Sequence, residues 1–519
     1  MANDPILLPS VTGESVTVRM YRGLLGDCFL LTHEVRPEPK KPPKRVFRTL
    51  IDCGVLQCIG TEANKPNTKA AVRHMAQVVE NLARDTGGVL DLVIATHEHY
   101  DHLSGFILHF ATFHEFTIKQ VWLAWTENAQ DELAKFVTEH QGRGLRQLIK
   151  ATKVQPFRAA ADEETERRQA AILDLLQFHG LDEGFERESE DTTAETTKAP
   201  RSCKAVIDWL KGKAETVRYL DPGEVVTFGL DARLTAHVLG PPRDAKNLLQ
   251  LNPTEGAGRE VYLTKPDDVA ALEATLRLLY PDPNAQTKPA RNPEDYPFSA
   301  RFDRLEDEKA PSNAVASLYY KASAEARRID GEWLGAAESL AMKIDGDVNN
   351  TSLALAIEVS GRDVLLFPAD AQVGNWLSWH DRTYPAKPAD KSTPTVTAED
   401  LLRRTVLYKV GHHGSHNATA RAKGLELMTS PDLVAMIPVV KSIAAEQKTS
   451  SNPEGWAMPY GDLDKRLREK TRERIIQGDG DRVTEDANFK GDKSRFELKY
   501  DEETPDPLWA ELTLKLPAP

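Results

Sequence analysis

The feature that most constrains this chain is a group of four potential metal ligands within six residues. The segment 96–105 reads THEHYDHLSG and directly follows the apolar run DLVIA, so the ligands come at the end of a predicted buried strand. Residues two apart at a strand end project to the same side, so His97 and His99 can bind one ion with their imidazoles. If the chain then turns, Asp101 and His102 can face a second ion. The small residues at positions 104 and 105 suit such a tight turn.

The alternative is that these histidines are solvated loop residues or hydrogen-bonded core residues. A lone histidine would favour that interpretation, but four ligands at HxHxDH spacing after an apolar strand seldom arise without a metal. The donors are nitrogen and oxygen. Such a set favours zinc first, with manganese or iron as competitors.

The motif HEHYDH resembles the HxHxDH signature of the metallo-β-lactamase superfamily, whose fold is an αββα sandwich of two mixed sheets with helices outside. LIDCG, with Asp52, resembles the strand and turn that precede the signature. FPAD resembles the segment that supplies the aspartate bridging both metals, which implies this role for Asp370. KVGHHGSHN resembles the segment with the last metal histidine, which is His412 or His413; we favour His412 as the ligand.

A narrower resemblance is to the hydrolase domain of the DNA-uptake channel proteins of competent bacteria. GLLGDCFLL, with Gly26 and Asp27, resembles their opening glycine-aspartate strand. NNTSLAL, with Asn350 and Ser352, resembles their Asn/Ser stretch, and residues 412–415 match their HHGS motif. The resemblance covers roughly residues 16–125, 220–242 and 345–475, in pieces.

The chain departs from this pattern in two places. Many superfamily members have a further metal histidine between the signature and the bridging aspartate, and His237 in TAHVLGPP is the nearest candidate by order. A lone strand histidine is more often structural, and we favour that interpretation. The channel domains also have a histidine-bearing motif after HHGS, where this chain has MPYGDLDKR with Asp462, so its specificity is expected to differ.

The resemblance and the periodicity together predict an α/β protein, a four-layer αββα sandwich of the metallo-β-lactamase type. We expect one domain over 1–519 with insertions at about 126–215, which is helical and acidic, and 243–345, which is rich in Pro and Asn. Residues 182–200 are expected to form a mobile acidic excursion. Strands are expected at 16–23, 27–34, 46–54, 91–96, 121–125, 223–229, 232–242, 351–359, 363–369, 406–410, 433–440, 495–500 and 508–516, and helices at 69–85, 129–140, 166–178, 375–380, 397–405 and 461–475.

Composition limits the class of protein. With 40% hydrophobic and 28% charged residues, this is an ordinary globular composition. The net charge of −13 repels polyanions on average, so any contact with nucleic acid must be local. The N-terminus has no signal-peptide pattern and no apolar run could span a bilayer, so we expect a soluble, cytoplasmic protein without membrane contact. The four cysteines show no CxxC spacing and are expected to be small buried hydrophobes.

The expected chemistry is hydrolysis with two divalent ions, zinc first. Between two cations a water molecule loses a proton near neutrality and becomes the nucleophile. In this scheme the metal ligands are His97, His99, Asp101, His102, Asp370 and His412. Asp101 also orients the water, and His413 donates a proton to the leaving group.

The expected substrate class is a nucleic acid or nucleotide, because the channel-domain resemblance implies a phosphodiesterase or nuclease. Six cations crowd the predicted helix at 461–475, and could meet phosphates: Lys465, Arg466, Arg468, Lys470, Arg472 and Arg474. A solvated face paired with Asp464, Glu469 and Glu473 is the favoured interpretation of this helix. Four tryptophans could stack bases but are more often core residues: Trp122, Trp125, Trp376 and Trp379.

Two other functions stay open at this point. A hydrolase of the same fold could act on a small ester or lactone, and its site should be narrow and apolar. A metal-stabilised scaffold without activity could dock a protein partner through the insertions. Retention of a complete ligand set weighs against the scaffold.

Overall fold

The computed structural model describes the residues 14–35, 45–56, 68–152, 172–173, 176, 199–248, 344–385, 395–447, 454–492, 494–501 and 506–515. The chain divides into two compact units. The first comprises residues 1–139, 177–261 and 345–519, and the second comprises 140–176 and 262–344. The predicted acidic excursion and Pro/Asn-rich loop lie almost entirely outside the described residues, as does Cys58.

The first sheet of the first unit has eight strands in the order β18-β19-β1-β2-β3-β5-β7-β8. The strands from β18 to β3 pair antiparallel, and those from β3 to β8 pair parallel. Their bounds are β1 (Glu14–Tyr21), β2 (Cys28–Val35), β3 (Arg45–Cys53), β5 (Leu92–Ile94), β7 (Gln120–Ala124), β8 (Thr216–Leu220), β18 (Phe496–Tyr500) and β19 (Trp509–Lys515).

The second sheet has seven strands in the order β17-β16-β15-β12-β11-β10-β9. Strands β9 to β12 pair antiparallel, and β12, β15, β16 and β17 pair parallel. Their bounds are β9 (Val225–Phe228), β10 (Leu234–Val238), β11 (Leu355–Val359), β12 (Asp363–Phe367), β15 (Thr405–Lys409), β16 (Val434–Ile437) and β17 (Ile475–Gln477). Two small ribbons pair β4 (Val89–Leu90) with β6 (Thr117–Ile118), and β13 (Thr383–Pro385) with β14 (Thr395–Thr397).

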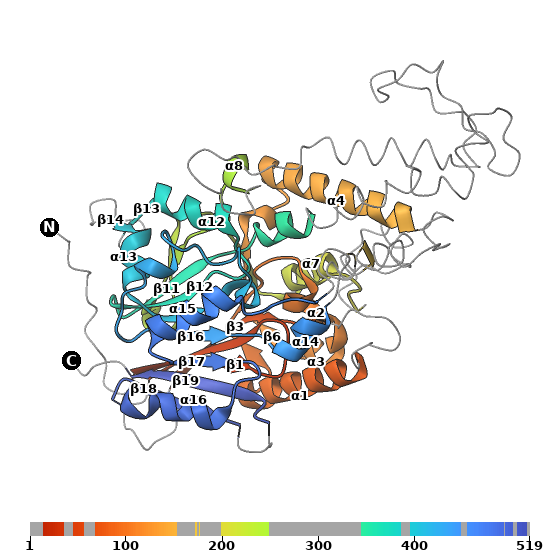
Figure 1. The fold of residues 1–519 in the computed structure, drawn as a ribbon. Helices are drawn as coiled ribbons and strands as arrows, with labels where there is room; N and C mark the ends of the chain where they lie inside the picture. The colour runs from red at the N-terminus through yellow and green to blue at the C-terminus, as the bar shows by residue number, and fades with distance from the viewer. Residues whose placement is uncertain are drawn as a thin grey trace, which may run out of the picture. The chain divides into compact units, whose positions relative to one another are not determined.

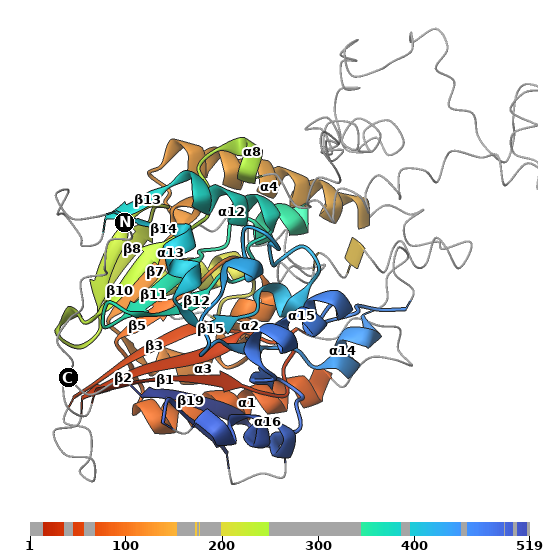
Figure 2. The ribbon, with the colours of Figure 1, turned by 60° about the vertical axis from the view of Figure 1, so that its left-hand side comes forward.

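One apolar core lies between the two sheets. Alternate residues of a strand point to opposite faces. On β19 of the first sheet Leu512 and Leu514 contribute to this core, and on β11 of the second sheet Leu355 and Ile357 do so. Because both sets belong to one buried cluster, the two sheets pack face to face (Figures 1 and 2).

Helices cover the other face of each sheet. The helices beside the first sheet are α1 (Thr68–Thr86), α2 (Tyr100–Leu108), α3 (Phe110–His114) and α7 (Cys203–Lys213), and they share a second buried cluster with its strands. Those beside the second sheet are α12 (Val373–Ser378), α13 (Ala398–Arg403), α14 (Lys441–Glu446) and α15 (Gly461–Thr471), which share a third cluster. Two further helices are α8 (Ala245–Leu248) and α16 (Arg482–Phe489), and α4 (Glu132–Thr152) runs from the first unit into the second.

The predicted mixed α/β class is therefore confirmed. The helix expected at 166–178 lies almost entirely outside the described residues. The other expected helices are present, and every expected strand has a counterpart within a few residues. Part of the first predicted insertion behaves differently from the expectation. Residues 203–220 form α7 and β8, which belong to the first unit and complete its sheet, because β8 pairs along its whole length with β7. The remaining boundaries of both insertions stay predictions.

Two further expectations concern the burial of the cysteines and the absence of a membrane-spanning segment. Cys28, Cys53 and Cys203 are free and buried, which confirms for these three that they act as small hydrophobes. No helix in the described part of the chain combines the length and the apolarity that crossing a bilayer requires.

Candidate metal centre

The predicted ligand segment lies between β5 and α2. His97 and His99 precede the helix, and Asp101 and His102 occupy its first turn. All four side chains are buried, with at most 3% of their surface exposed. Nε2 of His97 lies 3.2 Å from Nδ1 of His99. Two nitrogens that each lie about 2.0–2.1 Å from a tetrahedral zinc are separated by about 3.4 Å, so this spacing fits shared ligation of one ion.

The expected tight turn at 104–105 is wrong, because the helix continues through both residues. A Cβ atom on Gly105 would lie 2.6 Å from Sγ and 2.7 Å from the carbonyl oxygen of Cys53, so glycine lets α2 approach the end of β3. The hydroxyl of Ser104 donates to the carbonyl of Val55 and accepts from its amide, at 2.9 and 2.8 Å. These two small residues therefore dock the helix rather than bend the chain.

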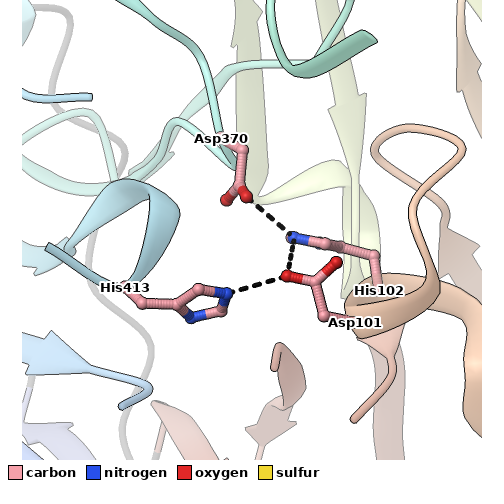
Figure 3. Close-up of side chains that lie close together, drawn as sticks. All are labelled: Asp101, His102, Asp370 and His413. Carbon is pink, nitrogen blue, oxygen red and sulfur yellow. Dashed lines mark hydrogen bonds and ion pairs between the residues drawn. The ribbon is translucent and has the colours of Figure 1, made fainter. Parts of the chain in front are cut away.

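His102 is oriented by Asp52 at the end of β3. The Nδ1 atom of His102 donates to Oδ2 of Asp52 at 2.7 Å, and the same carboxylate accepts from the backbone and hydroxyl of Thr96 at 2.8 and 2.7 Å. With Nδ1 occupied, Nε2 of His102 points at Oδ2 of Asp370, 3.2 Å away (Figure 3). A carboxylate that holds the far nitrogen of an imidazole is the usual support of a metal-bound histidine.

His413 approaches from the second sheet, on the 3₁₀ turn Gly411–Gly414 that follows β15. Its Nδ1 donates to the carbonyl of Pro438 at 2.8 Å. Its Nε2 lies 2.8 Å from Oδ2 of Asp101, as Figure 3 shows. A carbonyl can only accept, so the Nδ1 proton is fixed and Nε2 is the atom available to face a cation.

The four residues Asp101, His102, Asp370 and His413 form one group whose ligand atoms all lie within 4.8 Å of one another. A second such group, Asp27, Asp52 and His102, shares a member with it. Three buried atoms of the first group have no hydrogen-bond partner in the described structure: Oδ1 of Asp101, Nε2 of His102 and Oδ2 of Asp370. Nε2 of His102 and Oδ2 of Asp370 form an ion pair with each other at 3.2 Å, so Oδ1 of Asp101 is the atom left without a polar contact in the described structure. A buried polar atom of this kind is costly unless something binds it, and a divalent cation between these residues would do so.

No family model, curated protein or solved structure matches this chain. The site is therefore interpreted from its own geometry.

The two histidines of the HHGS segment are placed differently. The ring of His413 lies in the ligand group, whereas that of His412 is half-buried with its centroid 6.1 Å from the His413 ring. His412 contacts Asp370 through its backbone, whose amide donates to Oδ1 at 3.0 Å. The structure thus places His413, and not His412, in the group of potential ligands; the assignment of His412 as the ligand and His413 as the proton donor stays a prediction.

Burial and neighbouring charges shift the pKa values of the three histidines in this segment in different directions. Burial, helped by the neighbouring His102, holds the pKa of His97 well below its usual range. Burial likewise lowers the pKa of His99 to about 4, so both rings are neutral near pH 7, as ligation requires. Burial opposes the charged form of His102 too, but the surrounding carboxylates, Asp370 first, outweigh it and raise its pKa. The group of carboxylates therefore favours positive charge at this ring.

Lys409, the last residue of β15, was missed by the sequence analysis. Its ammonium group forms a buried ion pair with Asp27 and lies 3.4 Å from Oδ1 of Asp370. The coulombic effect of these two carboxylates outweighs burial and raises the pKa of Lys409, so it stays charged. A lysine at the end of the apolar strand VLYKV was the available signal, because a buried lysine needs a paired carboxylate.

Asp345 is a further residue that sequence reasoning missed. Its Oδ1 lies 3.6 Å from Nε2 of His99. Burial, and then the charges of Asp101 and Asp370, raise the pKa of Asp345 to about 8. It lies four residues before the Asn/Ser stretch, and no spacing rule connects it with the distant 97–102 segment.

The other side chains of the Asn/Ser stretch hold the loop that carries Asp370. The hydroxyl of Ser352 accepts from the amide of Asp370 at 3.2 Å. The side-chain oxygen of Asn350 accepts from the amides of Gln372 and Asn375, at 3.2 and 3.3 Å. The stretch thus positions the ligand loop through hydrogen bonds to its backbone.

Several other predicted residues lie elsewhere. His237 is buried on β10 beside Glu358, with 3.8 Å between Nε2 and Oε2, and it belongs to no ligand group among the described residues, as the structural interpretation expects. The four tryptophans named above are at most 1% exposed, which confirms them as core residues and makes base stacking by them wrong. On α15, Arg466 pairs with Glu469, and Arg468 with Asp464 and Glu473, as the solvated-face interpretation predicts.

Proposed function

We propose that this chain is a two-metal hydrolase with the four-layer αββα sandwich of the metallo-β-lactamase type. The observation that carries the proposal is the convergence of Asp101 and His102 from the first sheet with Asp370 and His413 from the second sheet. Two packed sheets with helices on their outer faces and the motif HEHYDH agree with the superfamily pattern. A scaffold has no physical need for such a buried group of potential metal ligands.

The donors divide into two sets. His97 and His99 form one pair, and His102 and His413 face Asp101 and Asp370. The charge of Asp370 acts on the rings of both sets. Imidazole nitrogens and carboxylate oxygens suit zinc, with manganese or iron as alternatives. Two such ions, when bound, supply the positive charge that activates a water molecule and stabilises an oxyanion.

The chain's own residues then perform three tasks. The neutral rings of His97 and His99 donate nitrogen lone pairs. Asp101 accepts a hydrogen bond from the nucleophilic water and orients it. His412, half-buried and with a buried Nδ1 that has no hydrogen-bond partner in the described structure, is placed to hold the proton for the leaving oxygen at this nitrogen.

We infer that the substrate is a phosphodiester of a nucleotide or nucleic acid, and that the protein acts in the cytoplasm. The support is the resemblance of GLLGDCFLL, NNTSLAL and HHGS to the DNA-uptake hydrolase domains. A second support is the cleft beside the HHGS segment, because half of its twelve lining residues are charged, whereas a narrow ester or lactone pocket is expected to be lined mostly by apolar residues.

The test combines metal analysis with hydrolysis of single-stranded DNA, RNA, cyclic nucleotides, bis-nitrophenyl phosphate and a lactone. The wild-type protein is expected to hold about two zinc equivalents and to cleave a phosphodiester, whereas Asp101→Ala and Asp370→Ala lose this activity. Asp486→Ala, an exposed carboxylate on α16, is the matched control and should behave as the wild type. Activity that survives both site substitutions contradicts the mechanism. Cleavage of the lactone alone contradicts the substrate class, and metal-loaded protein with no activity favours the scaffold.

A further inference from the structure

A cleft of about 680 Å³ opens beside the HHGS segment. One wall is the chain from His416 to Glu426, and the other is Tyr460 with the first turns of α15. This volume lies in the range of small-molecule and cofactor sites, roughly 300–1,000 Å³. It is large enough for a nucleotide.

The cleft is joined to the metal centre by short, well-packed connections. His416 follows His413 by three residues. The amide of Tyr460 donates to the carbonyl of Gly414 at 2.8 Å, so both walls are attached to the turn that carries His413. The hydroxyl of Thr419 is hydrogen-bonded to that of Tyr408 on β15 at 2.7 Å, which fixes the first wall to the sheet. These hydrogen bonds hold the walls of the cleft in a fixed position relative to the turn that carries His413.

Two cations of the lining are available for a ligand. Arg421 and Lys465 are exposed and form no ion pair with another described residue. Arg466, by contrast, is already neutralised by Glu426 and Glu469, at 2.5 and 2.8 Å. Asp462 is the one acidic residue in the lining that has no ion pair in the described structure. The lining carries three cationic and three acidic residues, so its charges balance, and Arg421 and Lys465 are its two cations outside an ion pair in the described structure.

Two aromatic side chains also line the same cleft. Tyr460 is 43% exposed, one of few large hydrophobic residues of the described chain that are exposed. The ring of His416, also exposed, lies 6.0 Å from it between centroids. Aromatic rings next to cations are the arrangement that binds single-stranded nucleotides, with a base on the ring and a phosphate on the cation.

We propose that this cleft binds one nucleotide unit of a single-stranded substrate next to the scissile phosphodiester, with the base against Tyr460 and a backbone phosphate at Arg421 and Lys465. The proposal rests on the proposed function. The nucleotide unit bound in the cleft is a part of the substrate that a small phosphodiester does not have. Binding at this cleft selects polynucleotides over small esters.

The first experiment measures binding without turnover, in the Asp101→Ala background, with a short single-stranded DNA oligonucleotide. Adding Arg421→Ala and Lys465→Ala is expected to weaken binding at least about tenfold. It should also reduce the slope of log K against log salt by about 0.7, because each phosphate of a single strand that the protein neutralises contributes about that much. A weaker complex with an unchanged slope, or unchanged binding, overturns the proposal.

The matched control removes two positive charges elsewhere in the first unit. Arg403→Ala on α13 and Lys499→Ala on β18 are exposed and outside the cleft. This pair should leave both the affinity and the salt slope at the background values. An equal loss in the control would show a general charge effect and contradict the cleft.

The second experiment tests the base contact. Tyr460→Ala is expected to remove most of the preference for an oligonucleotide over the same backbone without bases, whereas Tyr460→Phe keeps it, because stacking requires the ring and not the hydroxyl. A preference that persists in Tyr460→Ala contradicts the base position.

The third measurement separates the two proposals. In the metal-loaded wild-type background, the Arg421→Ala and Lys465→Ala pair should lower kcat/KM for the oligonucleotide at least about tenfold more than for bis-nitrophenyl phosphate. Equal losses on both substrates contradict the cleft but leave the hydrolase intact. Absence of hydrolysis by the wild type, with binding still lost in the cleft variant, contradicts the hydrolase and leaves the cleft as a nucleotide site.

Discussion

Nε2 of His413 lies 2.8 Å from Oδ2 of Asp101, although 312 positions separate the two residues in the chain. The contact joins the turn after β15 of the second sheet to the first turn of α2, which packs on the first sheet. Because the Nδ1 proton of His413 is committed to Pro438, the ring can meet Asp101 only as a cation or across a bound cation. The residues contributed by the first sheet and those contributed by the second sheet therefore meet at this pair.

The first prediction concerns the two adjacent histidines. His413→Ala is expected to lower zinc affinity by more than about 100-fold, beyond the loss typical of a supporting residue. His412→Ala should keep the metal and lower kcat. Isothermal titration with zinc and steady-state kinetics measure both effects, and the exposed His114→Ala serves as the control. Retention of zinc affinity in His413→Ala with its loss in His412→Ala would restore the assignment made from sequence.

The second prediction concerns Asp52, which holds His102 in place. In Asp52→Asn one carboxylate oxygen becomes an amide that cannot accept from both the His102 ring and Thr96. Zinc affinity should fall about 10–100-fold, with little change in the fold. Asp91→Asn is the control, since Asp91 accepts from the Arg48 amide far from the ligands. Equal zinc affinities in the wild type and Asp52→Asn would contradict this role.

A third prediction tests the docking of α2 on β3. Gly105→Ala gains helix propensity of up to about 1 kcal/mol, but its Cβ would overlap Cys53, so a net loss of about 1–3 kcal/mol in the free energy of unfolding is expected. Gly461→Ala at the start of α15 has no atom within 4 Å of its new Cβ and should change stability by less than about 1 kcal/mol. Urea unfolding compares the two. A stabilised Gly105→Ala would mean that the helix is not in close contact.

The fourth prediction concerns the buried charge of Lys409. Lys409→Met leaves Asp27 and Asp370 without their shared cation, and breaking such a buried pair costs about 3–5 kcal/mol. Added zinc should recover part of this loss, because a cation again lies near both carboxylates. Thermal unfolding with and without zinc measures it, and the exposed Lys499→Met is the control. The result that would count against this role is a variant as stable as the wild type without zinc.

The fifth prediction is a pH dependence set by Glu14. Burial opposes its charged form, but hydrogen bonds from His33 and Arg233 outweigh burial and lower the pKa of Glu14 from 4.5 to about 2. The folded pKa is below the unfolded value, so the stabilisation is complete above about pH 5 and disappears as the pH falls towards 2. Glu14→Gln should therefore cost about 1–2 kcal/mol at pH 7 and progressively less below pH 5.

Urea unfolding across this pH range measures the difference between Glu14→Gln and the wild type. Glu399→Gln is the matched control, because Glu399 pairs with Arg403 on an exposed helix face and contributes little. A difference for Glu14→Gln that stays constant from pH 7 to pH 3 would contradict the assignment.

Much of the local structure could be predicted from the sequence, because it depends on neighbours in the chain. The apolar period of residues 69–85 predicts α1, and the alternation in 508–516 predicts β19. The ligand types at 97–102 identify a metal segment by themselves. The helix α2 was missed because Gly105 and Ser104 suit a turn locally, and only contact with β3 makes a helix favourable there.

The tertiary structure alone decided which distant groups meet. Lys409 with Asp27, Asp345 with His99, and His413 rather than His412 with Asp101 follow from the packing of two sheets, which no local pattern encodes. The sequence determined the donor atoms, because the type of a side chain alone fixes which nitrogen or oxygen atoms it offers. Their distances depend on how the whole chain buries its apolar surface, and that is a property of the fold.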